Sequence, residues 1–129
     1  MHMILAVASG GALGALLRYC VFHWSAVLFG PVASVFLWGT LIVNVTGSFL
    51  MGLGMGSFEY LVSVSDTLRA FITIGVLGAF TTFSAFSWDV MSLLEKGAWG
   101  LAFLYALSSF VLSIAAVFLG YACVKLIVS

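Results

Sequence analysis

The chain has 129 residues, of which 64% are hydrophobic and only 6% are charged, and its formal net charge is zero. A soluble domain carries about 25% charged residues, so this composition excludes a soluble monomer, a nucleic-acid binder and a disordered segment. The mean hydropathy of +1.31 instead predicts an integral membrane protein that sits in a lipid bilayer. The zero net charge indicates no acidic or basic partner.

Apolar runs long enough to cross a bilayer, which takes about 20 residues, occur four times along the chain. They cover roughly 3–28, 34–57, 68–94 and 99–127. Helix breakers and charges separate them, at Gly30-Pro31, from Glu59 to Asp66, and from Glu95 to Gly97. Short connections make neighbouring helices antiparallel. The sequence therefore predicts an all-α fold of one domain over 1–129, with four transmembrane helices.

Positive charges are divided equally between the two ends of these predicted helices. Arg69 and Lys125 fall on the side of the termini, and Arg18 and Lys96 fall on the opposite side. The positive-inside rule then gives no preferred orientation. Either another feature fixes the orientation, or the chain inserts both ways and forms an antiparallel dimer. The second alternative would give each membrane face an aromatic belt, because one side carries Trp24, Trp38, Trp88 and Trp99.

Two stripes of polar side chains recur every four residues, which places each stripe on one helix face. The stripe in the second run comprises Thr40, Asn44 and Ser48, and the stripe in the fourth run comprises Tyr105, Ser109 and Ser113. The first stripe could be an interhelical hydrogen-bond clamp or the lining of a pore. The second stripe alone is only a weak indication of a pore, since a serine side chain often bonds the backbone of its own helix. Together they could line a narrow polar path.

In the third run, Gly75 and Gly78 are followed by Thr81 and Thr82. Glycine and β-branched residues are poor helix formers, so we expect a helix break between Gly78 and Thr82. Broken backbone at mid-membrane is tolerated only where protein buries it or where it lines a cavity. Carbonyl oxygens freed by the break could hold a cation. The alternative is a mild kink in which the threonine hydroxyls satisfy the backbone.

Phe83 and Phe86 follow this predicted break and share one helix face. Such a pair is usually a packing or lipid-facing pair. A phenyl ring, however, has a positive edge, so the two ring edges could contact a small anion that has lost its water. Asn44 and serine hydroxyls would then donate the stronger hydrogen bonds.

Four motifs carry a resemblance to a known family. They are Gly10-Gly11-x-x-Gly14 with Arg18-Tyr19, Gly39-Thr40-x-x-x-Asn44-x-x-Gly47-Ser48-Phe49-x-x-Gly52, Gly75-x-x-Gly78-x-x-Thr81-Thr82-Phe83-Ser84-x-Phe86-Ser87, and the spacing of Tyr105, Ser109 and Ser113. The third motif is highly specific. Over nearly its whole length the chain resembles the Fluc family of fluoride channels, also called CrcB.

This resemblance implies a passive, fluoride-selective channel that exports fluoride across the cell membrane, the bacterial inner or plasma membrane. It further implies a dual-topology antiparallel homodimer with two pores. By this likeness Phe83 and Phe86 meet fluoride beside the pore residue Asn44, and the polar track comprises Thr82, Ser84, Tyr105, Ser109 and Ser113. The likeness also makes Arg18 a vestibule residue. It assigns a structural sodium ion on the dimer axis to the backbone carbonyls of Gly78 and Thr81.

The sequence departs from the family pattern at two positions. Asp89 stands where the family often has glutamate, and Phe80 stands where it often has leucine, which leaves the role of each open. The main alternative function is a small dual-topology multidrug-type transporter. That chemistry needs a buried carboxylate, and only Asp89 lies inside a predicted span, near its end. A non-transporting subunit would use both polar stripes for packing. An enzyme is disfavoured, since no nucleophile–base pair or metal-ligand cluster is evident.

Overall fold

The computed structural model describes residues 1–29 and 34–128, which are helical apart from short connections. The elements are α1 (His2–Phe29), α2 (Ser34–Tyr60), α3 (Asp66–Ala70), η1 (Phe71–Leu77), α4 (Gly78–Phe80), α5 (Phe83–Glu95) and α6 (Trp99–Val128). The predicted connection at Pro31 lies outside the described residues. Within the described ranges, four stretches are long and apolar enough to cross a membrane: His2–Leu28, Leu37–Tyr60, Asp66–Glu95 and Trp99–Val128. The predicted all-helical fold with four membrane-crossing stretches is confirmed.

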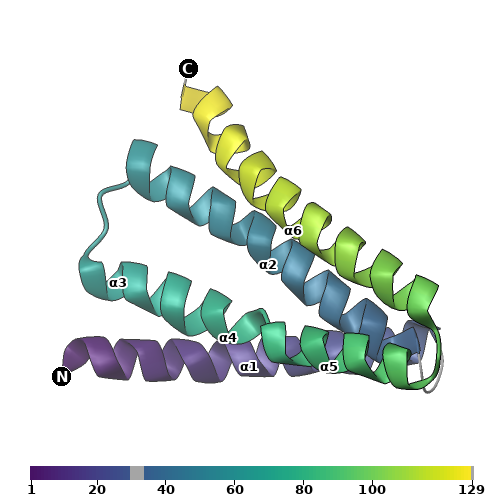
Figure 1. Ribbon diagram of the computed structural model, residues 1–129. Helices are drawn as coiled ribbons and strands as arrows, with labels where there is room; N and C mark the ends of the chain where they lie inside the picture. Colours follow the sequence, from purple (N-terminus) through teal and green to yellow (C-terminus); the bar gives the residue numbers. More distant parts are fainter. Residues whose placement is uncertain (30–33, 129) are drawn as a thin grey trace.

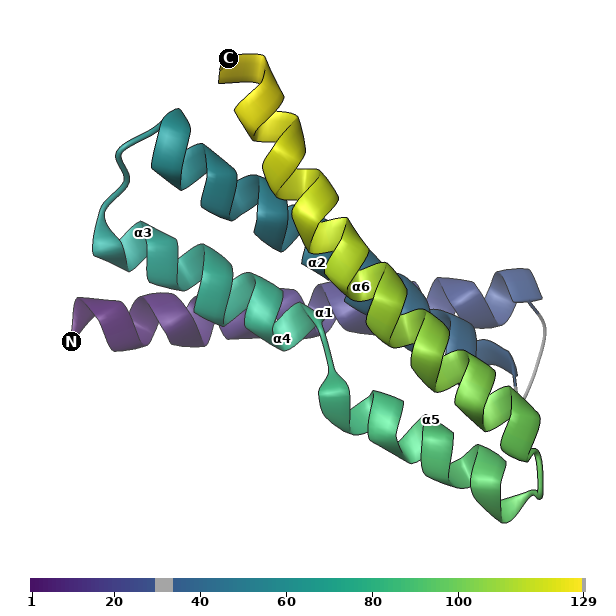
Figure 2. The same cartoon turned by 45° about the horizontal axis from the view of Figure 1, so that its top comes forward.

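The third of these stretches is divided into four helical segments. Its second segment, η1, is a π-helix, which the sequence did not predict. Between α4 and α5 the backbone is extended at Thr81 (φ −78°, ψ 156°) and at Thr82 (φ −151°, ψ 115°), and Figure 2 shows this straight connection between the two helices. Gly78 keeps helical angles (φ −64°, ψ −35°). The interruption is therefore narrower than expected and coincides with the two threonines.

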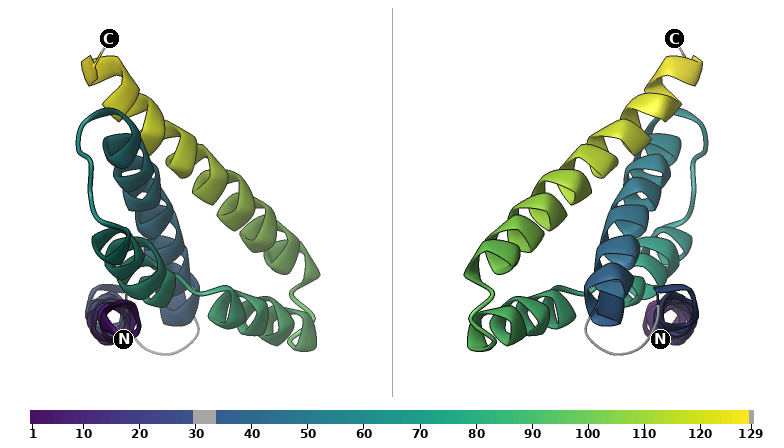
Figure 3. Two further views of the ribbon diagram at one scale, coloured as in Figure 1. Left: turned by 90° about the vertical axis from the view of Figure 1, so that its left-hand side faces the viewer. Right: turned by 90° about the vertical axis from the view of Figure 1, so that its right-hand side faces the viewer.

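The helices form two groups that meet at this interruption. One group consists of α2 and α6, which pack along most of their length (Figure 1). In the other group α1 lies against α3, η1 and α4. Beyond the interruption α5 leaves the second group and runs toward the start of α6 (Figure 3). The extended residues therefore let one membrane-crossing stretch contact both groups.

Glycines allow the backbones of α1 and η1 to approach closely. A Cβ atom on Gly14 would overlap the carbonyl oxygen of Val76, and one on Gly10 would lie 2.6 Å from the carbonyl oxygen of Phe71.

After the C-terminal end of α5, Gly97 has a φ of +73°. This left-handed conformation suits glycine and turns the chain from α5 into α6.

The single chain buries few of its described side chains. One small core comprises Leu93, Ala102 and Tyr105, where α5 meets α6. Large apolar side chains on the outer surface of α6 stay exposed, among them Phe103, Phe110 and Phe118. A soluble monomer rarely exposes so much contiguous apolar surface, so these faces must contact lipid or another protein chain.

Candidate functional site

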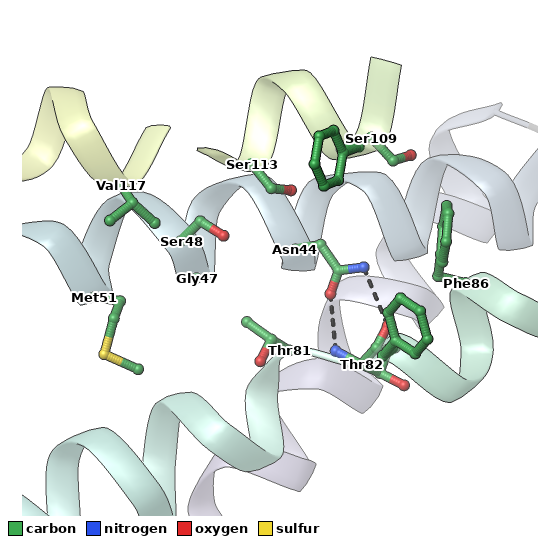
Figure 4. A pocket seen from close by; sticks show the side chains of 12 residues that line it. Asn44, Gly47, Ser48, Met51, Thr81, Thr82, Phe86, Ser109, Ser113 and Val117 are labelled. Carbon is green, nitrogen blue, oxygen red and sulfur yellow. Dashed lines mark hydrogen bonds between the residues drawn. The ribbon is translucent and has the colours of Figure 1, made fainter. Parts of the chain in front are cut away.

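A side chain of α2 takes over the hydrogen bonds of the interrupted backbone. Asn44 Oδ1 accepts a bond from the Thr82 backbone N–H at 2.8 Å, and Asn44 Nδ2 donates to the Thr82 carbonyl oxygen at 3.1 Å (Figure 4). Thr82 is buried, and a buried backbone amide without a partner is costly. Asn44 therefore clamps the interruption onto α2. Since the side-chain amide has two N–H donors, one remains for other contacts.

Thr82 also begins the next helix. Its backbone is extended, and its Oγ1 accepts a hydrogen bond from the Ala85 N–H at 3.2 Å. This is the usual arrangement at a helix N-cap, where threonine is a favoured residue. The hydroxyl oxygen also lies 3.3 Å from Ser84 Oγ. One residue thus ends the interruption and places two hydroxyl groups side by side.

The same two interactions divert the donors that would normally pair with two backbone carbonyls. In a continuous α-helix the Gly78 carbonyl would accept from the Thr82 N–H, and the Thr81 carbonyl would accept from the Ala85 N–H. These N–H groups instead bond Asn44 Oδ1 and Thr82 Oγ1. Both carbonyl oxygens named by the sequence analysis therefore lose their usual helical partners.

A cavity of about 330 Å³ opens over one face of α2, with α6 on one side and the interruption between α4 and α5 on the other (Figure 4). It brings together most of the predicted site residues. Its lining contains Asn44, Gly47, Ser48, Met51, Thr81, Thr82, Phe83, Phe86, Ser109, Phe110, Ser113 and Val117. None of these lining residues is charged. Polar contacts in this cavity therefore come from amide and hydroxyl groups alone.

Three aromatic rings form a row that begins with two phenylalanines in the lining of this cavity. The ring centroids of Phe83 and Phe86 are 5.5 Å apart, and those of Phe86 and Tyr105 are 5.6 Å apart. Phe83 is 78% exposed in the single chain, whereas Phe86 packs against the small core. The two phenylalanines are thus neighbours, as their spacing predicted, but their surroundings differ.

A second cavity, of about 810 Å³, is lined by two further predicted residues, Arg18 and Ser84. It lies between α1 and α5, and Asp89 also lines it. Thr82 contributes to the lining of both cavities. Apart from Tyr105 and Gly78, the predicted site residues therefore line one of two cavities on either side of Thr82.

Tyr105 lies in neither lining, although the sequence analysis grouped it with Ser109 and Ser113. Its hydroxyl donates a buried hydrogen bond of 3.0 Å to Asp89 Oδ2. Sequence reasoning left the role of Asp89 open, and this bond is the structural reason for its burial. An aspartate followed 16 residues later by a tyrosine gives no signal that could have predicted the pair.

Thr40 is a further polar residue of this region that the sequence analysis noted only as part of the α2 stripe. Among the described residues, the buried side-chain polar atoms that make no close hydrogen bond are Thr40 Oγ1 and Ser109 Oγ. Thr40 is fully buried. Both hydroxyls nevertheless interact with the Tyr105 hydroxyl, and Thr40 also interacts with the Asp89 carboxylate. Buried hydroxyls normally have a partner, and the Tyr105–Asp89 pair supplies it here. The four-residue spacing of Thr40 with Asn44 was the available signal.

Metal-ligating side chains do not cluster in the part of the chain that the structure describes: no group of three or more His, Cys, Asp or Glu residues could hold a metal ion there. A bound cation would therefore need backbone or hydroxyl oxygens. The Gly78 and Thr81 carbonyls, whose usual donors are diverted, fit that requirement.

Comparison with known proteins places this geometry in a family. The family model described as "CrcB-like protein, Camphor Resistance (CrcB)" matches residues 5–121. The chain belongs to the CrcB family. The resemblance read from the four motifs is thereby confirmed over nearly the full length.

Relatives of this CrcB chain are each named "Fluoride-specific ion channel FluC". The protein from Agrobacterium fabrum (strain C58) is 52% identical over 122 residues, which cover 95% of each chain. The protein from Rhodospirillum centenum is 46% identical over 129 residues, or 97% of each chain. The protein from a Roseiflexus species is 49% identical over 117 residues, covering 91% of this chain and 92% of the relative. These names describe ion channels, in agreement with the expectation that the chain is not an enzyme.

The Asn44–Thr82 clamp generates a test of local stability. Asn44→Ala should leave the buried N–H and carbonyl of Thr82 unpaired and lower the free energy of unfolding by roughly 1–3 kcal/mol. Thermal unfolding in detergent and hydrogen exchange of the peptide containing Thr82 would measure this effect. Thr46→Ala is the matched control, because the exposed Thr46 hydroxyl bonds only the Ile42 carbonyl of its own helix. Unchanged exchange at Thr82 in Asn44→Ala would contradict the clamp.

Proposed function

We propose that this protein is a passive, fluoride-selective channel that exports fluoride across the bacterial plasma membrane. The observation that carries the proposal is the uncharged cavity at the helix interruption, lined by two phenylalanine rings, an asparagine amide and serine hydroxyls. Membership of the CrcB family and the names of the relatives support fluoride as the transported ion.

The cavity offers a small dehydrated anion several contacts of modest strength. Ser109 and Ser113 line the cavity with hydroxyl groups, and Asn44 retains one N–H beyond its bonds to Thr82. The positive edges of the phenylalanine rings add weaker contacts. Conduction requires binding that is favourable enough for entry and weak enough for release. Neutral donors meet both conditions better than a fixed charge would.

Anions would reach this cavity through the larger one beside it. Arg18 lines the larger cavity, and a positive charge at a pore mouth raises the local concentration of anions. Thr82 lines both cavities, and the neighbouring Ser84 hydroxyl lines the larger one. In this proposal they pass the ion from the charged vestibule to the neutral cavity.

We also propose that two chains assemble as an antiparallel homodimer with two pores, each built from both subunits. The equal division of lysine and arginine between the two ends supports dual topology. Phe83 and Gly78, both beside the interruption, are exposed in the single chain. A partner subunit would cover this surface and complete the wall of each pore.

We further propose that the carbonyl oxygens of Gly78 and Thr81, whose usual helical donors are diverted, hold a structural sodium ion. One chain offers these two oxygens, so a two-fold axis through the site would provide four. Unwound backbone coordinates sodium in this way in other membrane proteins. Bound sodium would neutralise carbonyl dipoles that are otherwise unpaired in an apolar surrounding.

Sodium binding can be tested through stability. The melting temperature of the purified dimer should be higher in sodium chloride than in choline chloride. Thr81→Ser should keep this difference, because the proposed ligand is the backbone carbonyl. Sodium analysis of the dialysed protein provides an independent readout. A melting temperature that is the same in both salts, together with no retained sodium, would contradict the site.

Transport can be tested with fluoride efflux from liposomes that contain only this protein, with chloride as the control ion. Phe83→Ile and Phe86→Ile preserve apolar bulk but remove the ring edge. A lost edge contact is worth about 0.5–1.5 kcal/mol, which corresponds to a two- to tenfold lower rate. Phe103→Ile is the matched control on the exposed surface of α6. Fluoride efflux near the wild-type rate in both test variants would show that the rings only pack.

Dual topology can be tested by adding charge to one end of the protein. One double variant, Glu95→Lys with Gly100→Lys, adds positive charge near the connection between α5 and α6. The other, Val62→Lys with Ser63→Lys, adds positive charge at the opposite end, between α2 and α3. All four positions are exposed. Each double variant expressed alone should insert in one orientation and lose fluoride transport. Co-expression of the two should restore transport through mixed dimers. Full transport by either variant alone, in a demonstrated single orientation, would overturn the antiparallel dimer.

A further inference from the structure

The backbones of α2 and α6 touch at one crossing point formed by two glycines. A Cβ atom on Gly52 would overlap the carbonyl oxygen of Val117 and lie 2.9 Å from the Tyr121 nitrogen. A Cβ atom on Gly120 would overlap the carbonyl oxygen of Phe49 and lie 2.9 Å from the Leu53 nitrogen. The contact is reciprocal, so neither helix can accept a side chain here without moving away from the other.

This crossing point lies at the edge of the neutral cavity. Met51, next to Gly52 in sequence, and Val117, whose carbonyl oxygen faces Gly52, both line the cavity (Figure 4). Two polar walls of the same cavity come from these two helices, with Asn44 and Ser48 on α2 and Ser109 and Ser113 on α6, while Thr81 and Thr82 at the interruption form the third. The distance between these walls therefore depends on how closely the helices approach at the crossing.

The other side of the crossing is fixed by polar contacts. Tyr121 donates a hydrogen bond of 2.6 Å to Glu59 Oε2, and the hydroxyl oxygens of Tyr60 and Tyr121 are 3.0 Å apart. These contacts hold the two helices together beyond the glycines. A displacement at the crossing is consequently directed toward the cavity, which Ser109 and Ser113 of α6 line.

We propose that Gly52 and Gly120 are positioning residues that set the width of the ion path and thereby its selectivity between fluoride and larger halides. The inference rests on the proposed function. A methyl group at either position forces α2 and α6 apart until the new carbon reaches ordinary van der Waals distance, 3.4 Å or more. The wider cavity then admits chloride and loosens the contacts that hold the smaller anion.

The experiment measures fluoride and chloride efflux from liposomes for alanine variants of four glycines. Gly52→Ala and Gly120→Ala should lower the fluoride-to-chloride rate ratio at least tenfold. Gly56→Ala should lower the ratio at least twofold, because its Cβ would meet Val124 Cβ at the milder distance of 3.1 Å. Gly54→Ala is the control on the same helix; its nearest neighbour is a ring carbon of Phe58 at 3.9 Å, and the ratio should stay unchanged.

The outcomes separate this inference from the proposed function. Absence of fluoride efflux in the wild-type protein would overturn the proposed function itself. Fluoride efflux in the wild type with an unchanged ratio in Gly52→Ala and Gly120→Ala would overturn only the positioning role. A lower fluoride rate at an unchanged ratio would mean that the glycines serve packing alone, and also overturns it. If these two variants fail to assemble, Gly56→Ala decides, and an unchanged ratio there overturns the inference.

Discussion

The exchange of two hydrogen bonds between Asn44 and Thr82 is the interaction on which the rest of the site depends. An extended residue inside an apolar chain exposes one donor and one acceptor that a helix would have satisfied. The asparagine amide offers one acceptor and a matching donor at 2.8 and 3.1 Å. The backbone can therefore leave the helix at Thr81 without leaving Thr82 unpaired. Removing the amide would make the interruption costly and favour a continuous helix.

Three features of the structure follow from that interruption. The change in chain direction allows α5 to leave α1 and reach α6, which brings Phe86 beside Tyr105. The diverted N–H groups free the carbonyls of Gly78 and Thr81. Thr82 is placed between the two cavities. An aromatic row, a candidate cation site and a residue shared by two cavities thus have a single local cause.

The sequence correctly predicted the features that depend on local periodicity and hydropathy. It was less accurate for the helix break, whose position depends on tertiary contacts. The four apolar runs and the pairing of Phe83 with Phe86 follow from composition and helical spacing. The break was expected to begin at Gly78, because glycine is a poor helix former, but Gly78 remains helical. The exit from the helix occurs where a side chain from another helix can replace the lost bonds. No single-helix propensity contains that information.

The position of each residue along α6 explains why Tyr105, Ser109 and Ser113 do not form one continuous polar track. Tyr105, Ser109 and Ser113 share a face in any α-helix, but the contact that each makes depends on the neighbour at its height along α6. At the level of Tyr105 that neighbour is Asp89 on α5, and at the level of Ser109 and Ser113 it is the cavity beside α2. The tyrosine therefore bonds a carboxylate, whereas the two serines line the cavity. Spacing fixed their common direction but not their partners.

The separation of charge between the two cavities has a physical consequence for any small anion. Arg18 and Asp89 both line the larger cavity, whereas the lining of the smaller one has no charged residue. A cation within the narrow cavity would bind an anion tightly in the low dielectric and slow its release. In the proposed channel, Arg18 in the larger cavity would attract the anion. The neutral donors of the smaller cavity would then bind the anion weakly enough to let it pass. In the proposed channel the neutral cavity would discriminate by size, and the closeness of α2 and α6 at their glycine contact would set that size.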